Sequence, residues 1–207
     1  MGLLHLLLES PGAFLLMAIP LLYAVIFHEI AHGFVANRMG DPTARHMGRL
    51  SLNPLKHLDP VGTFMLFIFG FGWAKPVPVN FAAIGNDRKA LIAVSAAGVV
   101  TNMILAFIAL FLLQLLKPSP GGIPATALTY FAYINIILAA FNLIPIPPLD
   151  GSKILMGFLP PGLQRQLSRL EPYGFFIIIA LLFLGVLRPV ILFIFNILYG
   201  LIGFVLG

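Results

Sequence analysis

The stretch AFLLMAIPLLYAVIFHEIAHGFVA, residues 13–36, decides the fold of this chain. Nearly all of its 24 residues are apolar, and about 20 consecutive apolar residues are enough for a helix to cross the hydrocarbon core of a bilayer. Two histidines and a glutamate stand close to its end, although ionisable side chains are costly inside a membrane and usually mark a function there. The stretch therefore predicts a membrane-spanning helix that carries a functional site near one end.

The composition of the whole chain places it in a membrane. Of its 207 residues, 60% are apolar and 9% are charged, whereas an ordinary soluble domain has about 45–50% apolar and about 25% charged residues. A soluble protein would need a surface in which about 25–35% of the residues are charged. Soluble and disordered chains are thus excluded, and the length leaves room for one domain, residues 1–207.

Five further apolar stretches follow the first one. Residues 61–73 are too few to cross as a helix and are interrupted by glycines, so we expect a re-entrant or interfacial segment there. Arg188 and Pro189 separate the last two stretches, which predicts a helical hairpin with a short first arm. The five stretches are residues 61–73, 90–116, 123–145, 173–187 and 190–206. We therefore expect an all-α polytopic bundle of about five transmembrane helices, with a short re-entrant or β-like segment after the first one.

The basic residues predict the orientation of the chain. If residues 61–73 return to the side from which they enter, ten of the twelve basic residues lie on one side, in the connectors 37–60, 74–89 and 149–172. Lys117 and Arg188 then lie on the other side. Because cytoplasmic loops are enriched in Lys and Arg, we expect a cell-membrane protein with these connectors and the C-terminus in the cytoplasm. The basic residues do not cluster on one element, as nucleic-acid binding requires, and no nucleic-acid partner is expected.

The two histidines of the first stretch are spaced for metal binding. His28 and His32 are one helical turn apart and differ by about 40° around the helix, so both rings can meet one tetrahedral ion. Glu29 lies at the edge of that face, where it can reach a water beside the ion. This is the general-base position of the His-Glu-x-x-His zinc hydrolases. The alternatives are hydrogen-bonded polar residues in a packed helix, or a proton relay in a transporter.

A catalytic zinc site needs a third protein ligand, and a chain without cysteine must take it from His, Asp or Glu. Asp150 ends the run FNLIPIPPLD, residues 141–150, whose three prolines predict extended backbone at membrane depth. Such backbone is tolerated only inside protein or beside a wet cavity, and an active site is such a cavity. Asp150 is therefore the expected third ligand. A helix N-cap is its alternative role, and His46 and His57 are the alternative ligands.

The two motifs, residues 28–33 and 142–151, resemble the site-two protease family of intramembrane zinc metalloproteases. Residues 52–60 and 72–80 are also similar to the segment that follows the first motif in bacterial and archaeal members. The resemblance implies the minimal, core-only subgroup, because the chain has no room for the PDZ or nucleotide-sensing domains of larger members. How substrates are chosen is not implied.

The resemblance also implies a role for each motif residue. One Zn²⁺ per chain would be bound by His28, His32 and Asp150, with Glu29 as the base. Asn142 would lie near the scissile carbonyl, and Asn102, which ends a Gly-x-x-x-Asn pattern, would be a candidate substrate or oxyanion contact. A carboxamide beside a zinc site can donate to the oxyanion of peptide hydrolysis. The alternative for both asparagines is interhelical hydrogen bonding, and Asn135 is expected to be structural.

Together these residues predict an endopeptidase that hydrolyses transmembrane proteins near the cytoplasmic side, in regulated intramembrane proteolysis. Because the peptide bonds of a helical substrate are shielded, the substrate must unwind, and we expect residues 75–81 to hold it as an extended strand. The expected partners are the lipid bilayer and the transmembrane substrates, and the identity of any regulatory membrane partner is open. A metal-ion transporter with the same side chains and an inactive scaffold that binds helices are the alternatives.

Overall fold

The computed structural model describes residues 3–69, 72–84 and 87–207, and the regular structure of these residues is helical. Four of the described helices are long and apolar enough to cross a membrane, and two shorter helices that meet at 64° can form a fifth span. The four are α2 (Pro11–Arg38), α6 (Arg88–Leu116), α7 (Ile123–Asn142) and α11 (Leu187–Leu206), and the bent pair is α9 (Pro161–Ser168) and α10 (Glu171–Phe183). The prediction of an all-α polytopic membrane protein with about five spans is confirmed.

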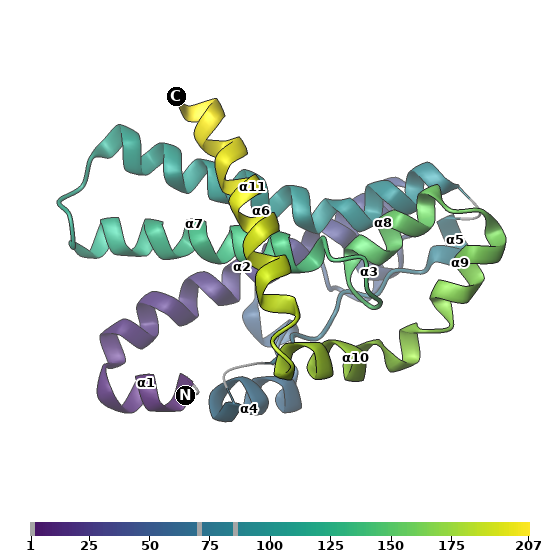
Figure 1. Cartoon of the computed structure of the whole chain (residues 1–207), viewed down its shortest axis with the longest axis horizontal. Coiled ribbons are helices and arrows are strands. Elements are labelled where there is room, and N and C mark those ends of the chain that lie inside the picture. Colours follow the sequence, from purple (N-terminus) through teal and green to yellow (C-terminus); the bar gives the residue numbers. More distant parts are fainter. Residues whose placement is uncertain (1–2, 70–71, 85–86) are drawn as a thin grey trace.

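Short helices occupy the connectors between these spans or precede the first of them (Figure 1). They are α1 (Leu3–Glu9), α3 (Thr43–His46), the 3-10 helix η1 (Pro54–Lys56), α4 (Pro60–Phe69), α5 (Phe81–Ile84) and α8 (Asp150–Phe158). α1 and α2 form a hairpin at the N-terminal end, and α8 leads from α7 towards the C-terminal helices. Among the described helices no further folded domain is inserted, so the connectors themselves must build any site outside the spans.

α6 is the central helix of the bundle and packs on α2, α7 and α8. The buried apolar residues of the three packed spans are mostly small: Ala24 and Ala36 of α2, Ala106 and Ala109 of α6, and Ala132, Ala139 and Ala140 of α7. Lipid tails are as apolar as leucine, so membrane helices associate through the close approach of small residues. Large side chains such as Ile104 and Phe111 point outward instead. The α2 and α6 backbones therefore come close together.

The segment after the first span leaves the bundle and returns to it. α4 lies between Leu58 and Ala74, which form an isolated antiparallel bridge. The N–H of Lys75 donates to the carbonyl of His57 at 2.8 Å. The two ends of the segment therefore lie side by side, as the predicted re-entrant or β-like segment requires. Residues 70 and 71 of that segment lie outside the described residues.

The two arms of the predicted C-terminal hairpin meet earlier than the sequence predicts, and they do not lie antiparallel: α11 runs steeply away from α10 in Figure 1. α10 ends at Phe183, Gly185 turns the chain with a φ of 72°, and α11 begins at Leu187. Arg188 and Pro189 lie in the first turn of α11, where proline is tolerated because its missing N–H has no intrahelical acceptor. The predicted break at these two residues is therefore wrong. The first arm, α10, is short, as expected.

α10 and the start of α11 support the proline-rich turn between α7 and α8. The predicted span at residues 123–145 ends at Asn142, and the chain is not helical again until Asp150. The turn packs on α10 and α11 in a buried apolar cluster of Ile144, Leu149, Ile178 and Leu187. The C-terminal helices thus fix the turn that carries Asp150 into the bundle.

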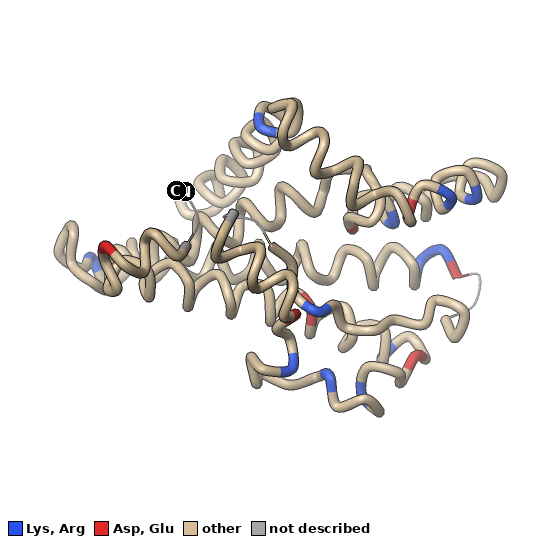
Figure 2. Tube along the Cα trace, turned by 90° about the horizontal axis from the view of Figure 1, so that it is seen from below, with Lys and Arg blue, Asp and Glu red and all other residues tan. Residues whose placement is uncertain are grey.

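The basic residues gather towards one end of the bundle. Figure 2 shows most of the Lys and Arg positions in the right-hand half of the view, the half in which α5, α8 and α9 lie in Figure 1. The connection between α6 and α7, which contains Lys117, lies at the opposite end. The charge asymmetry follows the three connectors that the sequence assigns to one side. The C-terminus does not lie with them: Nε2 of Gln114, near the Lys117 end of α6, donates to the carbonyl of Leu206 at 3.4 Å. The prediction that the C-terminus shares the side of the basic connectors is therefore wrong, because α11 runs towards the α6–α7 connection.

Candidate active site

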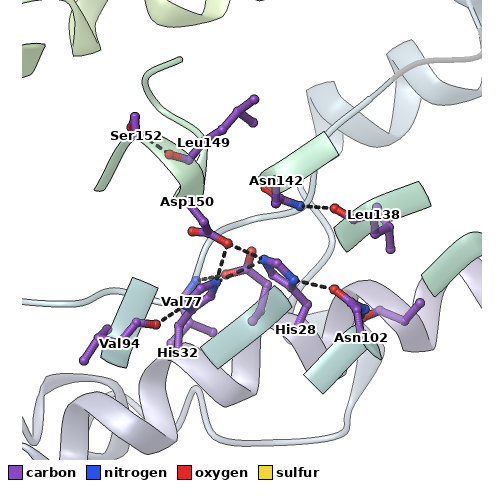
Figure 3. Close-up of polar contacts among 12 residues, drawn as sticks. His28, His32, Val77, Val94, Asn102, Leu138, Asn142, Leu149, Asp150 and Ser152 are labelled. Carbon is purple, nitrogen blue, oxygen red and sulfur yellow. Dashed lines mark hydrogen bonds and ion pairs between the residues drawn. The ribbon is translucent and has the colours of Figure 1, made fainter. Parts of the chain in front are cut away.

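α2 and the N-terminus of α8 bring three side chains together (Figure 3). His28 and His32, one turn apart on α2, are buried and expose 6% and 9% of their surface. Their Nε2 atoms lie 3.0 Å apart. Oδ2 of Asp150, the first residue of α8, lies 3.1 Å from Nε2 of His28 and 3.2 Å from Nε2 of His32. The three atoms form a nearly equilateral triangle.

This triangle fits a metal ion. The ligand atoms of a tetrahedral zinc, each at about 2.0–2.1 Å from the metal, are about 3.3 Å apart, close to the distances in the triangle. Oδ2 of Asp150 is buried, and none of the described residues donates a hydrogen bond to it. In the described part of the chain, His28, His32 and Asp150 are the group of His, Asp and Glu side chains that can hold a metal.

The far sides of both imidazoles are held by hydrogen bonds. Nδ1 of His28 lies 2.6 Å from Oδ1 of Asn102, and Nδ1 of His32 lies 2.8 Å from the carbonyl oxygen of Val94. Both partner oxygens are acceptors, so each Nδ1 carries the hydrogen and donates it, and each Nε2 keeps its lone pair. Three lone-pair atoms therefore face one another without a hydrogen between them, an arrangement that a shared cation stabilises.

α6 approaches the two imidazoles at Gly98. A Cβ atom at this position would collide with the rings of both His28 and His32. The resemblance to site-two proteases includes this glycine but gives no reason for it. The reason is steric, because the backbone of α6 lies directly against the histidine pair.

Glu29 shares a cavity of about 220 Å³ with the triangle. Its Oε2 accepts a hydrogen bond from the backbone N–H of Val77 at 2.8 Å. Asn142 and Lys153 also line the cavity. The carboxylate of Glu29 thus faces the same space as the candidate ligands and is oriented by a backbone group of the segment after α4.

That segment, residues 75–80, forms one wall of the cavity and is fastened to the preceding connector. Arg49 donates to its first carbonyl at 2.8 Å, and the buried carboxylate of Asp41 accepts the N–H of Asn80 at 2.6 Å. Burial alone would raise the pKa of Asp41. The hydrogen bonds from the Thr43 hydroxyl and from the N–H groups of Asn80 and Thr43 outweigh burial and hold that pKa below its ordinary value. The wall is therefore held by an ionised aspartate.

The two asparagines of the motifs lie in different surroundings. Asn142, the last residue of α7, lines the cavity, and its Nδ2 donates to the carbonyl of Leu138 at 2.9 Å. An amide nitrogen carries two hydrogens, so one remains for a ligand. Asn102 is fully buried behind His28, and its Nδ2 donates to Asn135 and to the Ala24 carbonyl. Asn102 therefore lies away from the cavity, in the interhelical position that was the alternative to substrate contact.

The alternative roles of the other residues receive no support from the geometry. Leu149, not Asp150, occupies the N-cap position of α8, and no side chain caps that helix. His57 is buried with its Nε2 at 2.7 Å from the carbonyl of Ser51. His46 lies exposed at the end of α3. Neither of these two histidines belongs to the triangle.

Three groups at the site were not anticipated from the sequence. The N–H of Val77 and the carbonyl of Val94 are backbone groups, which every residue other than proline offers, so no sequence signal marks them. Lys153 follows Asp150 by one turn of α8, and its Nζ lies 5.1 Å from the ring centre of Phe81. The spacing from Asp150 is the signal that would have placed Lys153 at the cavity.

The fold and the site together define a membrane metallopeptidase, and comparison with known proteins agrees. The chain belongs to peptidase family M50, whose family model matches residues 117–185. It is 44% identical over 172 residues to YwhC of Bacillus subtilis, with 80% of this chain and 78% of that protein covered. The resemblance to site-two proteases is confirmed, and a peptidase is favoured over a metal-ion transporter.

More distant relatives are similar over most of the chain. Rip2 of Mycolicibacterium smegmatis is 31% identical over 181 residues, which cover 84% of this chain and 69% of Rip2. MJ0611 of Methanocaldococcus jannaschii is 30% identical over 137 residues, 63% of each chain. The names of all three relatives describe them as candidate zinc metalloproteases. No solved structure is a significant match to this chain.

Proposed function

We propose that this chain is an intramembrane zinc endopeptidase that hydrolyses peptide bonds of transmembrane substrates near the cytoplasmic side. The observation that carries the proposal is the triangle of His28 Nε2, His32 Nε2 and Asp150 Oδ2, which opens on the cavity of Glu29 within a bundle of apolar helices. His32 stands six residues before the end of α2, or about 9 Å along the helix, which supports cleavage close to one membrane surface. Residues 1–207 are proposed to act as a single metalloprotease domain.

The triangle would hold one zinc ion per chain. Zinc bound there supplies a Lewis acid that polarises the scissile carbonyl and lowers the pKa of an attacking water. The hydrogen bonds to the two Nδ1 atoms support this role, because they aim both Nε2 lone pairs at the same point.

Glu29 would move the protons of the reaction. Its carboxylate takes a proton from the attacking water while the water oxygen bonds to the carbonyl carbon, and it then passes that proton to the amide nitrogen as the carbon–nitrogen bond breaks. The Val77 N–H holds Oε2, which leaves Oε1 to accept the proton. Glu29 is thus proposed as the general base and acid, not as a ligand.

Asn142 would stabilise the charge that develops on the carbonyl oxygen. Asn142 lines the cavity, and one of its two Nδ2 hydrogens is left for a ligand because the other is bound to the Leu138 carbonyl. Removal of one such donor typically lowers kcat by about 10²–10³.

The extended residues 75–80 would hold the unwound substrate. The N–H groups of Lys75, Val77 and Asn80 are engaged within the protein, and the two prolines have none. Among these residues the N–H of Val79 has no partner within the described part of the chain, so a substrate strand would pair with this donor and with the carbonyl acceptors of the segment. Val79→Pro tests this role better than a change at Val77, whose N–H orients Glu29. Unchanged cleavage of a model transmembrane peptide by Val79→Pro would contradict strand addition.

The orientation of the chain is part of the proposal. Most basic residues lie in the right-hand half of Figure 2, the half in which Figure 1 shows α8, the helix that begins at Asp150. Cytoplasmic loops are enriched in Lys and Arg. The site would therefore open near the cytoplasmic surface of the cell membrane. Its partners would be the bilayer and the transmembrane substrates.

The deciding experiment measures zinc content and cleavage together. Wild type and Glu29→Gln are purified in detergent, and each is assayed for bound zinc and for hydrolysis of a labelled transmembrane peptide. We expect one zinc in both proteins and cleavage by wild type alone. Loss of zinc in Glu29→Gln would make Glu29 a ligand, and absence of zinc from wild type would contradict the proposal.

A further inference from the structure

A chain of buried polar side chains runs from α7 through α6 to the candidate metal site. Asn135 of α7 and Asn102 of α6 both expose 0% of their surface. Nδ2 of Asn102 donates to Oδ1 of Asn135 at 2.7 Å, and Oδ1 of Asn102 accepts the Nδ1 hydrogen of His28 at 2.6 Å. Three membrane-spanning helices are thus linked to the His28 ring, at the nitrogen opposite its candidate ligand atom Nε2. Figure 3 shows the last of these bonds, between Asn102 and His28.

In each hydrogen bond of this polar network, the neighbouring groups fix which atom donates and which accepts. Nδ2 of Asn135 donates to the carbonyl of Phe131 at 2.8 Å, so the amide of Asn135 turns Oδ1 towards Asn102. Asn102 uses its two Nδ2 hydrogens on Asn135 and on the Ala24 carbonyl, so its Oδ1 faces His28. An Asn102 amide turned by 180° would place a donor against the Nδ1 hydrogen of His28. The chain therefore keeps the hydrogen on Nδ1 and the lone pair on Nε2.

Helix association alone does not account for this arrangement. Buried asparagines often join membrane helices, and the bonds from Asn102 to Asn135 and to the Ala24 carbonyl would be enough for that purpose. Here each donor meets an acceptor, and the chain ends on the ring nitrogen opposite a candidate ligand atom. Groups that accept from a ligand histidine set its tautomer and its ring orientation.

We infer that Asn135 is a positioning residue for the metal: by holding the amide of Asn102, it keeps the His28 ring in the orientation and tautomer that bind the ion. The inference rests on the proposed function, because it takes His28 as a ligand. Asn102 acts on the ring directly, whereas Asn135 acts only through Asn102. A residue expected from the sequence to be structural thereby gains a part in metal binding.

The test is a double-mutant cycle on zinc affinity, measured by chelator competition on the purified full chain in detergent. Loss of a group behind a ligand typically weakens metal binding by about 10- to 100-fold, and we expect this for Asn102→Ala. Asn135→Ala should lie near the lower end of that range, about tenfold. The double variant should bind zinc no more weakly than Asn102→Ala alone. Additive losses would overturn the inference, because they would mean that Asn135 acts independently of Asn102.

Two further variants separate positioning from packing. Thr129→Ala is the matched control, since Thr129 lies on the same helix and its hydroxyl donates only to the carbonyl of Ala125, one turn earlier. It should bind zinc like wild type. In Asn135→Asp, a carboxylic acid with its hydrogen towards the Phe131 carbonyl keeps both bonds of Asn135, the donor to Phe131 and the acceptor for Asn102, and should retain the wild-type affinity. A loss of zinc affinity in Asn135→Asp as large as in Asn135→Ala would contradict the role of Asn135 as the hydrogen-bond acceptor for Asn102.

The visible absorption bands of the cobalt-substituted protein report on the geometry of the metal site, and a change in helix packing alone does not shift them. The visible cobalt bands should change in Asn135→Ala and remain unchanged in Thr129→Ala. Asn135→Val, which keeps more bulk but offers no acceptor to Asn102, replaces the alanine variant if that variant does not fold. Unaltered zinc affinity and cobalt bands in the folded Asn135 variant would refute the inference alone, whereas a wild type that binds no zinc would refute the proposed function.

Discussion

Replacement of Gly98 by alanine tests the contact between α6 and the histidine pair. The added Cβ would lie 2.5 Å from Nε2 of His32 and 2.6 Å from Nδ1 of His28, whereas ordinary contacts begin at 3.4 Å. The rings must therefore retreat by about 0.8–0.9 Å, a shift several times larger than the ±0.2 Å that metal–ligand distances tolerate. Overpacking of this kind costs about 1–3 kcal/mol. If that cost falls on the metal site, zinc binding by Gly98→Ala weakens by about 5- to 150-fold.

The assay measures zinc affinity by chelator competition and the thermal midpoint of the zinc-free protein. Gly203→Ala on α11 is the control, because no atom lies within 4 Å of the Cβ that it adds. Alanine is favoured over glycine inside a helix by about 0.5–1 kcal/mol, so the control should be slightly more stable than wild type and bind zinc equally well. Wild-type zinc affinity together with a wild-type thermal midpoint in Gly98→Ala would refute the proposed contact.

Four other changes test the remaining assignments. Asp150→Asn should lower the zinc content, because an amide is a poor substitute for the carboxylate ligand; full metal retention would remove Asp150 from the ligand set. Asn142→Ala should lower kcat by about 10²–10³ with zinc retained, and an unaltered rate would leave Asn142 a structural role. The pKa of Asp41 is lowered on folding, so its stabilisation is complete above the ordinary value of 3.8 and is lost as the pH falls through its lower folded value. Asp41→Asn should therefore show a weaker loss of stability in acid than wild type, as measured by thermal midpoints across that pH range. Because the chain has no cysteine, Arg165→Cys and Lys117→Cys can be labelled individually in intact cells. An impermeant thiol reagent should reach position 117 and spare position 165, and the reverse pattern would invert the proposed orientation.

The sequence alone determined the features that depend on local spacing and on the bilayer. The spans follow from the length of apolar residues needed to cross the hydrocarbon core, and the structure has them where the stretches lie, apart from the break before α11. His28 and His32 meet because residues four apart share one face of any helix. Gly185 escaped notice as the turn because Arg188 and Pro189 look like a stronger interruption, although proline is tolerated in the first turn of a helix.

The tertiary structure decided how distant groups reach the histidines, and it alone selected their backbone partners. Asp150 reaches them because the turn before α8 packs on α10 and α11, and composition does not encode that packing. The sequence placed Asn142 near the scissile carbonyl and offered Asn102 as a further substrate or oxyanion contact, but helix packing buries Asn102 behind His28 and leaves Asn142 at the cavity. The hydrogen-bond partners from Val77 and Val94 are backbone groups. Such groups are identical at nearly every position, so only the folded chain can select them.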